Sequence, residues 1–211
     1  MERSLLWKSL QVVGRVLTSL LFELKVYGIE NVPQTGGALL VANHQSYLDP
    51  VLVAVRLRRP VSFLAKSELF ENPFLRWLIT SLHAFPVRQG RGDHGAVRET
   101  IRRLDEGHIL NMYPEGTRTS DGEIGRLEKG IALILRKTTV PVIPVAIEGS
   151  FQAWPNRQKL FRPGRIHVIY GKPLHFNEMR SDEIMAALDS ALRKLFEQLR
   201  EMRSFDLCIS K

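Results

Sequence analysis

The sequence of 211 residues is poor in cysteine, in acidic residues and in long uncharged hydrophobic runs. Its one cysteine, Cys208, excludes an intramolecular disulfide and any CxxC metal site. The six histidines form no recognised zinc-ligand spacing, so no metal site is predicted. Hydrophobic residues (44%) and charged residues (25%) are present in ordinary globular proportions, and the length predicts one main domain.

The deficit of acidic residues leaves the chain basic. Lys and Arg number 30 against 22 Asp and Glu, for a net charge of +8. Residues 56–103 hold ten of the basic side chains and four of the acidic ones. A basic surface favours an anionic partner, which leaves nucleic acid, an acidic membrane surface or a phosphorylated substrate, beside the simpler role of keeping the protein soluble.

The N-terminal segment 4–24 is rich in Leu and Val, yet it is too interrupted to predict a membrane span. Its longest uncharged stretch is 16–22, far shorter than the roughly 20 apolar residues that a span needs. At helical spacing, its polar residues share one narrow face and its Leu and Val residues the opposite side. This pattern predicts an amphipathic helix that contacts a membrane, with a helix packed on the core as the alternative.

Short apolar runs alternate with helical patterns along the rest of the chain. This alternation predicts an α/β fold, a mostly parallel mixed sheet flanked by helices, with the amphipathic N-terminal helix attached. We expect residues 1–27 to form the membrane-associating segment and residues 28–211 the catalytic domain. The expected strands are 38–42, 61–65, 84–87, 109–113, 142–147 and 166–170; the expected helices are 50–57, 67–82, 95–106, 128–137 and 181–200.

His44 follows a predicted strand directly, and Asp49 precedes a predicted helix. Ligands bind at the carboxyl ends of strands in such sheets. The four residues between them allow the Asp49 carboxylate to fold back onto one imidazole nitrogen, which would leave the other nitrogen free to take a proton. The alternative is a helix-capping Asp beside an unrelated His. Ser46 lies in no GxSxG elbow, so a serine triad is disfavoured.

Basic side chains also follow predicted strands. Lys66, Arg88 and Arg118 each come at or just after the end of one, so they are expected at the same edge of the sheet as His44. Guanidinium groups match the geometry of a phosphate. A phosphate pocket is therefore predicted, although each cation taken alone is more simply a solvated surface charge. No GxxxxGK[ST] loop is present, which disfavours nucleotide hydrolysis.

Four ordered blocks resemble the glycerolipid acyltransferase family. They are the NHxxxxD block (Asn43, His44, Asp49), Phe85–Arg88, Pro114–Arg118 and Val142–Val145. The resemblance covers about residues 28–175, which is most of the chain. The sequence departs from the family's pattern at His83, where Gly is frequent, and at Tyr113, where Phe is frequent.

The resemblance implies transfer of a fatty acyl group from acyl-CoA or acyl carrier protein to a glycerol hydroxyl, without a cofactor. The most similar branch is that of the 1-acyl-sn-glycerol-3-phosphate acyltransferases, which make phosphatidate from a lysophospholipid. It makes His44 the general base and Asp49 its orienting partner. The residues expected around the acceptor's phosphate, with Lys66 added from its position, are Lys66, Arg88, Glu115, Gly116, Thr117 and Arg118.

Other readings stay open. The acceptor could instead be glycerol 3-phosphate, another lysophospholipid or a lyso-aminolipid. A non-catalytic membrane- or nucleic-acid-binding protein is the alternative of a different class, and no stacking-aromatic array supports nucleic acid. The expected location is the cytoplasmic face of a bacterial inner membrane, with the enzyme bound monotopically to an anionic surface.

Overall fold

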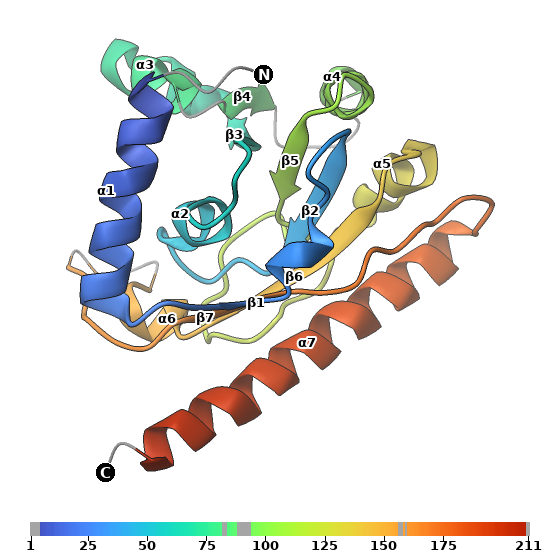
Figure 1. The fold of residues 1–211 in the computed structure, drawn as a ribbon. Coiled ribbons are helices and arrows are strands. Elements are labelled where there is room, and N and C mark those ends of the chain that lie inside the picture. Colours follow the sequence, from blue (N-terminus) through green and yellow to red (C-terminus); the bar gives the residue numbers. More distant parts are fainter. Residues whose placement is uncertain (1–4, 82–83, 88–93, 156–157, 159, 210–211) are drawn as a thin grey trace.

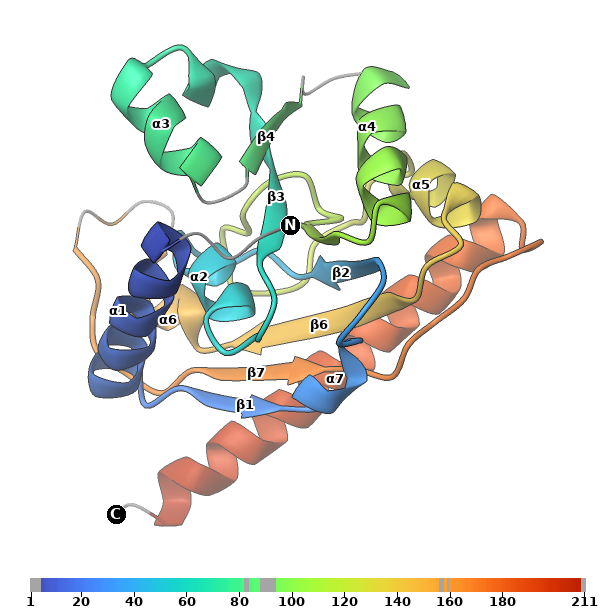
Figure 2. The ribbon, with the colours of Figure 1, turned by 45° about the horizontal axis from the view of Figure 1, so that its top comes forward.

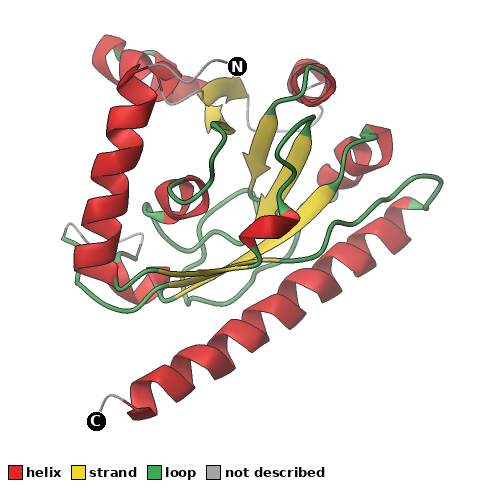
Figure 3. Ribbon diagram, viewed as in Figure 1, coloured by secondary structure: helices red, strands yellow, loops and turns green. Residues whose placement is uncertain are grey.

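The computed structural model describes residues 5–81, 84–87, 94–155, 158 and 160–209. These residues form three layers, in which one seven-stranded sheet lies between two layers of helices (Figures 1 and 3). The α/β class and the helices flanking the sheet are confirmed.

The sheet is mixed and mostly parallel, as predicted. Its strand order is β1-β7-β6-β2-β5-β3-β4, and only the β6–β7 pair is antiparallel. β2 lies between β6 and β5, so the turn after β2 opens at the carboxyl edge of the parallel part of the sheet. The strands are β1 (Lys25–Tyr27), β2 (Ala38–Ala42), β3 (Val61–Lys66), β4 (Ala84–Val87), β5 (Ile109–Met112), β6 (Val142–Glu148) and β7 (His167–Tyr170).

Each face of the sheet is covered by its own helices. One face packs against the end of α1 (Leu5–Phe22), α2 (Asp49–Ala54) and α6 (Ser150–Ala153). The other face packs against α4 (His94–Asp105), α5 (Ile131–Lys137) and the long α7 (Ser181–Ile209). The view in Figure 2 shows α3 (Pro73–Ser81) beside β4 at the far edge. Short 3₁₀ turns occupy Ile29–Asn31 and Ser67–Phe70.

Two hydrophobic cores lie on the two faces of the central strand. In β2, Leu40 points to the core shared with α2, and Leu39 points to the core shared with α5 and α7. Every residue of this strand is buried. Burial on both faces explains why the strand appears in the sequence as a continuous apolar run and not as an alternating one.

Helix boundaries differ from expectation where proline or long-range contacts decide them. The helix predicted over 67–82 is split, because Pro73 lacks an N–H and starts α3. The helix predicted over 181–200 continues to Ile209. Arg203 in this extension forms an ion pair with Glu148 at 2.8 Å, a contact that local sequence does not reveal.

Two short elements were not predicted from the sequence. α6 follows Gly149 and has only four residues. β1 lies inside the segment 1–27, for which we expected only an amphipathic membrane-associating helix, and it pairs with β7 as the edge strand of the main sheet.

α1 turns its polar face toward the domain. Gln11 Nε2 donates to the Leu57 carbonyl at 2.5 Å, and Arg15 Nε donates to the Val55 carbonyl at 2.8 Å. These carbonyls lie at the end of α2, where a helix has unsatisfied acceptors and attracts cations. The apolar face therefore points away from the domain. Its exposed side chains, each between 48% and 76% accessible, are Val12, Val13, Val16, Leu17 and Leu20.

Among the helices that the structure describes, none combines the length and hydropathy required for a transmembrane span.

Candidate active site

The turn that follows β2 is fixed by side chains on every side. The Asn43 side-chain amide donates to the Ile147 carbonyl at 2.9 Å and accepts from the Ile147 N–H at 2.7 Å. These two bonds continue the pairing of β2 with β6 beyond the last residue of β2. Gln45 Nε2 donates to the Gly122 carbonyl at 2.6 Å. Ser46 Oγ donates to the Trp154 carbonyl at 2.7 Å. The backbone of this turn is thereby held before any ligand binds.

His44 and Asp49 form the pair that the sequence predicts. His44 Nδ1 lies 2.8 Å from Asp49 Oδ2, and this bond carries the Nδ1 proton because an ionised carboxylate can only accept. The same oxygen accepts the backbone N–H groups of Gln45 (2.6 Å) and Ser46 (2.7 Å). Asp49 is fully buried at the first residue of α2, where the helix N-terminus favours its charge.

The other imidazole nitrogen of His44 is available to a substrate. No hydrogen-bond partner for Nε2 is found in the described ranges, and the side chain is 19% accessible. In a neutral imidazole, a proton on Nδ1 leaves the lone pair on Nε2. The arrangement suits removal of a proton from a hydroxyl placed at Nε2.

Tyr113 lies flat against the imidazole. The two ring centroids are 3.8 Å apart and the planes differ by 13°. Burial raises the pKa of the Tyr113 hydroxyl well above its ordinary value, so the ring beside His44 is neutral throughout the useful pH range. Stacking fixes the plane of the imidazole, while the bond to Asp49 fixes its rotation within that plane.

The Glu115 carboxylate holds the backbone of the site through both of its oxygens. Its Oε1 accepts the His44 backbone N–H at 2.8 Å, and its Oε2 accepts the Gly125 N–H at 2.8 Å. Burial raises the pKa of this carboxyl, against the opposing effect of the two backbone N–H groups. Both oxygens face protein, so Glu115 joins the His44 turn to the loop around Gly125.

The loop 114–119 closes against the same turn. The Thr119 N–H donates to the His44 carbonyl at 2.9 Å. Gly116 adopts a positive φ of 68°, and its N–H donates to the Tyr113 carbonyl at 3.1 Å within this loop. The Arg118 guanidinium lies over the Tyr47 ring, with Cζ 3.6 Å from the ring centroid.

The structure thus brings His44, Asp49 and Glu115 into direct contact and places Arg118 beside the same turn. Thr117 is exposed in the loop. Lys66 ends β3, and its side chain lies outside the described part of the chain. Arg88 lies outside the described residues, as does His83.

Two aromatic contacts were missed by the sequence analysis. Tyr113 was noted only as a departure from Phe, and Tyr47 only as one of the four residues between His44 and Asp49. The signal was present, since both rings are adjacent in sequence to the predicted site residues, but ring stacking requires the geometry of two loops.

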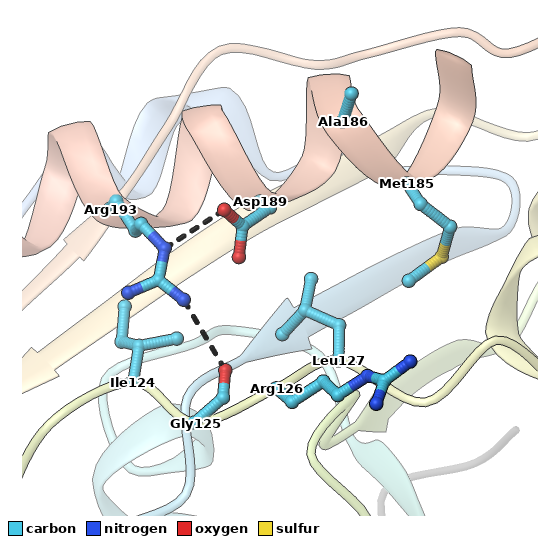
Figure 4. Close-up of a pocket in the computed structure, with 8 residues that line it drawn as sticks. All are labelled: Ile124, Gly125, Arg126, Leu127, Met185, Ala186, Asp189 and Arg193. Atoms are coloured by element: carbon cyan, nitrogen blue, oxygen red, sulfur yellow. Dashed lines mark hydrogen bonds and ion pairs between the residues drawn. The ribbon is translucent and has the colours of Figure 1, made fainter. Parts of the chain in front are cut away.

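A hollow of about 510 Å³ lies between α7 and the segment 124–127. This segment contains Gly125, whose N–H donates to Glu115. Figure 4 shows Arg193 there, paired with Asp189 and bonded to the Gly125 carbonyl. No residue of the His44 turn lines it. Within the described residues, no group of three or more His, Cys, Asp or Glu side chains is arranged to hold a metal ion.

The fold places the His44–Asp49 pair at the carboxyl edge of the parallel part of the sheet, and such a pair can accept a proton from a hydroxyl group. A family model described as Acyltransferase matches residues 23–148, which is more than half of the chain. The chain belongs to this family, and it is an acyltransferase.

Similar proteins have consistent names. The chain is 31% identical over 189 residues to a 1-acyl-sn-glycerol-3-phosphate acyltransferase of Bacillus subtilis, covering 88% of this chain and 92% of that one. It is 28% identical to a chloroplastic enzyme of the same name from Arabidopsis thaliana, covering 81% of this chain but 47% of that longer one.

A solved structure has the same fold. The 1-acyl-sn-glycerophosphate acyltransferase of Thermotoga maritima superposes with a TM-score of 0.79 at 29% identity. The match covers 91% of this chain and 79% of that one.

Proposed function

We propose that this acyltransferase esterifies the free sn-2 hydroxyl of 1-acylglycerol 3-phosphate, giving phosphatidate, with acyl-CoA or acyl carrier protein as donor. The names of its relatives support the acceptor. The observation that carries the chemistry is the 2.8 Å bond between His44 Nδ1 and the buried Asp49 carboxylate, which leaves Nε2 as a base.

The reaction needs one base and no covalent bond between the acyl group and the enzyme. His44 Nε2 takes the proton of the acceptor hydroxyl as its oxygen bonds to the thioester carbonyl carbon. The tetrahedral intermediate collapses, the C–S bond breaks, and the departing thiolate takes the proton back from Nε2. Asp49 stabilises the imidazolium in between, and general base catalysis of this kind contributes about 10²–10⁴-fold.

We assign the acceptor's phosphate to the basic side chains at the carboxyl edge of the sheet, next to His44. Arg118 is the best supported ligand, because its guanidinium lies beside the His44 turn. We retain Lys66 and Arg88 as further cations of this pocket, and Gly116 and Thr117 as the loop that shapes it. The Glu115 carboxylate would repel a phosphate, so its part is to hold the His44 turn.

The exposed apolar face of α1 is assigned to a membrane surface. Its five exposed aliphatic side chains point away from the domain, whereas Arg15 donates to the Val55 carbonyl within the domain. Burying such a face in the interface of a bilayer provides monotopic binding. Residues 1–27 would then supply both this contact and the edge strand β1, with residues 28–211 carrying the chemistry.

An acceptor panel tests the proposal. The purified protein is offered labelled oleoyl-CoA or oleoyl-acyl carrier protein with lysophosphatidate, glycerol 3-phosphate, lysophosphatidylethanolamine or a lyso-aminolipid. We expect phosphatidate to be the main labelled product. Transfer only to another acceptor would contradict the proposed substrate and reassign it.

A further inference from the structure

A row of aromatic rings joins the end of α1 to the active-site turn. Phe22 contacts Phe161, Phe161 contacts Trp154, and Trp154 contacts Tyr47, with ring centroids 5.7, 6.0 and 5.5 Å apart. Tyr47 belongs to the turn between His44 and Asp49. Figures 1 and 2 show residues 160–166, which precede β7, passing next to this end of α1. The row therefore runs from the membrane-facing helix to the catalytic turn.

The rings are held in place but open to the outside. The Ser46 hydroxyl fixes the Trp154 carbonyl, and Trp154 Nε1 donates to the Gln158 carbonyl at 3.0 Å. Yet Phe161 is 42% accessible and Tyr47 48% accessible. Only Phe22, at 3%, belongs to the core. Large apolar rings fixed at a surface next to a polar site are typical of ligand contacts.

The row ends on a cation. The Arg118 guanidinium lies over the Tyr47 ring, with Cζ 3.6 Å from the ring centroid, and no hydrogen bond to it is found within the described residues. A guanidinium held by a ring face still has N–H groups that can bind a phosphate as a fork. A phosphate-binding group at one end and apolar rings along the rest match a single-chain amphiphile, not a wholly polar ligand.

We propose that Tyr47, Trp154 and Phe161 form a subsite for the acyl chain already carried by the acceptor, and that Tyr47 positions Arg118 at its phosphate end. This inference rests on the proposed function, since it assumes a lysophospholipid acceptor. The chain lies along the rings toward α1, and the phosphate meets Arg118. The hydroxyl then lies near His44, because Tyr47 and His44 share one turn. Tyr47 is a positioning residue and a wall of the subsite.

Steady-state kinetics with two acceptors test the subsite. Palmitoyl and hexanoyl lysophosphatidate share a phosphate and a hydroxyl and differ only in chain length. Trp154→Ala is expected to raise the palmitoyl KM about tenfold relative to the hexanoyl KM, with kcat unchanged, because it removes a large apolar contact. Phe205→Ala removes an exposed ring on α7 and is the matched control. Vesicle binding of both variants is measured alongside.

Tyr47 is tested by a separate pattern. Tyr47→Leu removes the ring beneath Arg118, so it is expected to raise KM for both acceptors by about tenfold. Tyr47→Phe keeps the ring and should have the wild-type KM for both acceptors. An increase in KM in Tyr47→Phe as large as that in Tyr47→Leu would contradict the positioning role.

Binding without turnover gives an independent measurement. The chain has three Trp residues, so Trp7→Phe with Trp77→Phe leaves Trp154 as the one emitter. Its fluorescence is expected to shift and saturate with palmitoyl lysophosphatidate, and to respond far less to the hexanoyl form. Unchanged chain-length dependence in Trp154→Ala, with wild-type turnover intact, would overturn the subsite. Failure of the wild type to acylate any lysophosphatidate would instead overturn the proposed function.

Discussion

The Tyr113 ring covers one face of the His44 imidazole, with centroids 3.8 Å apart and planes nearly parallel. Asp49 holds the edge of the same imidazole through Nδ1. One contact on the face of the imidazole and one at its edge therefore leave the ring little rotational freedom. A base that is already oriented loses less entropy when the transition state forms, which is the benefit of positioning in catalysis.

Removing the stacked ring should slow turnover while leaving the pair intact. Tyr113→Leu is expected to lower kcat at least tenfold with a smaller change in the acceptor KM, because the imidazole plane is no longer fixed. Tyr113→Phe keeps the stack and should recover most of kcat. Equal kcat values for the Leu and Phe variants would show that stacking plays no part.

Glu115 is expected to act on the fold of the site and not on phosphate binding. In Glu115→Gln, one N–H donor of the amide must face the N–H of His44 or Gly125. We expect the free energy of unfolding to fall by about 1–3 kcal/mol, measured by urea denaturation. Exposed Glu30 gives the control Glu30→Gln, with no expected effect. A stable Glu115→Gln protein with a raised acceptor KM would instead favour direct phosphate contact.

The sequence predicted the strands β2 to β7, the sheet type and the His44–Asp49 pair because each depends on local pattern. A buried strand is an apolar run, and a turn of four residues between His and Asp is readable from spacing. The contacts of Glu115 and Tyr113 depend on how two loops meet, so spacing along the chain does not reveal them.

The orientation of α1 illustrates the same limit. Periodicity predicted a polar side and an apolar side for this helix. Which side meets the domain depends on the carbonyls of Val55 and Leu57 at the end of α2, which accept from Arg15 and Gln11. β1 escaped prediction because three residues are too few to show a period.

Membrane binding should depend on the exposed apolar face of α1. Leu20→Ser changes a side chain that is 76% accessible, so the unfolding free energy should change by less than about 0.5 kcal/mol. Partitioning onto vesicles containing phosphatidylglycerol should fall about tenfold, because the contact of one Leu with lipid is lost. Phe205→Ser, on an exposed ring of α7, is the control. Equal loss of binding in both variants would argue against a role for this face.

Acid should destabilise the protein through His167. Burial lowers the pKa of this side chain, so the unfolded chain takes up a proton more readily than the folded one. Stability is then expected to fall as the pH drops below about 6.5, by at most about 1.4 kcal/mol per pH unit for this one group.

The variant His167→Phe isolates that effect. It cannot titrate, and it keeps an aromatic ring against Tyr27, whose ring centroid lies 6.0 Å away. Urea denaturation at pH values from about 7.5 to 5.5, which bracket the ordinary histidine pKa, should show the wild type losing stability faster than the variant. Parallel stability curves would mean that His167 contributes nothing to the acid sensitivity.

The most direct measurement is the formation of labelled phosphatidate from oleoyl-CoA and lysophosphatidate by the wild type, His44→Ala and Asp49→Asn. The account predicts product from the wild type, a loss of at least about 10²-fold in His44→Ala, and a large loss in Asp49→Asn with vesicle binding unchanged. Wild-type turnover in folded His44→Ala would contradict the assignment of His44 as the base.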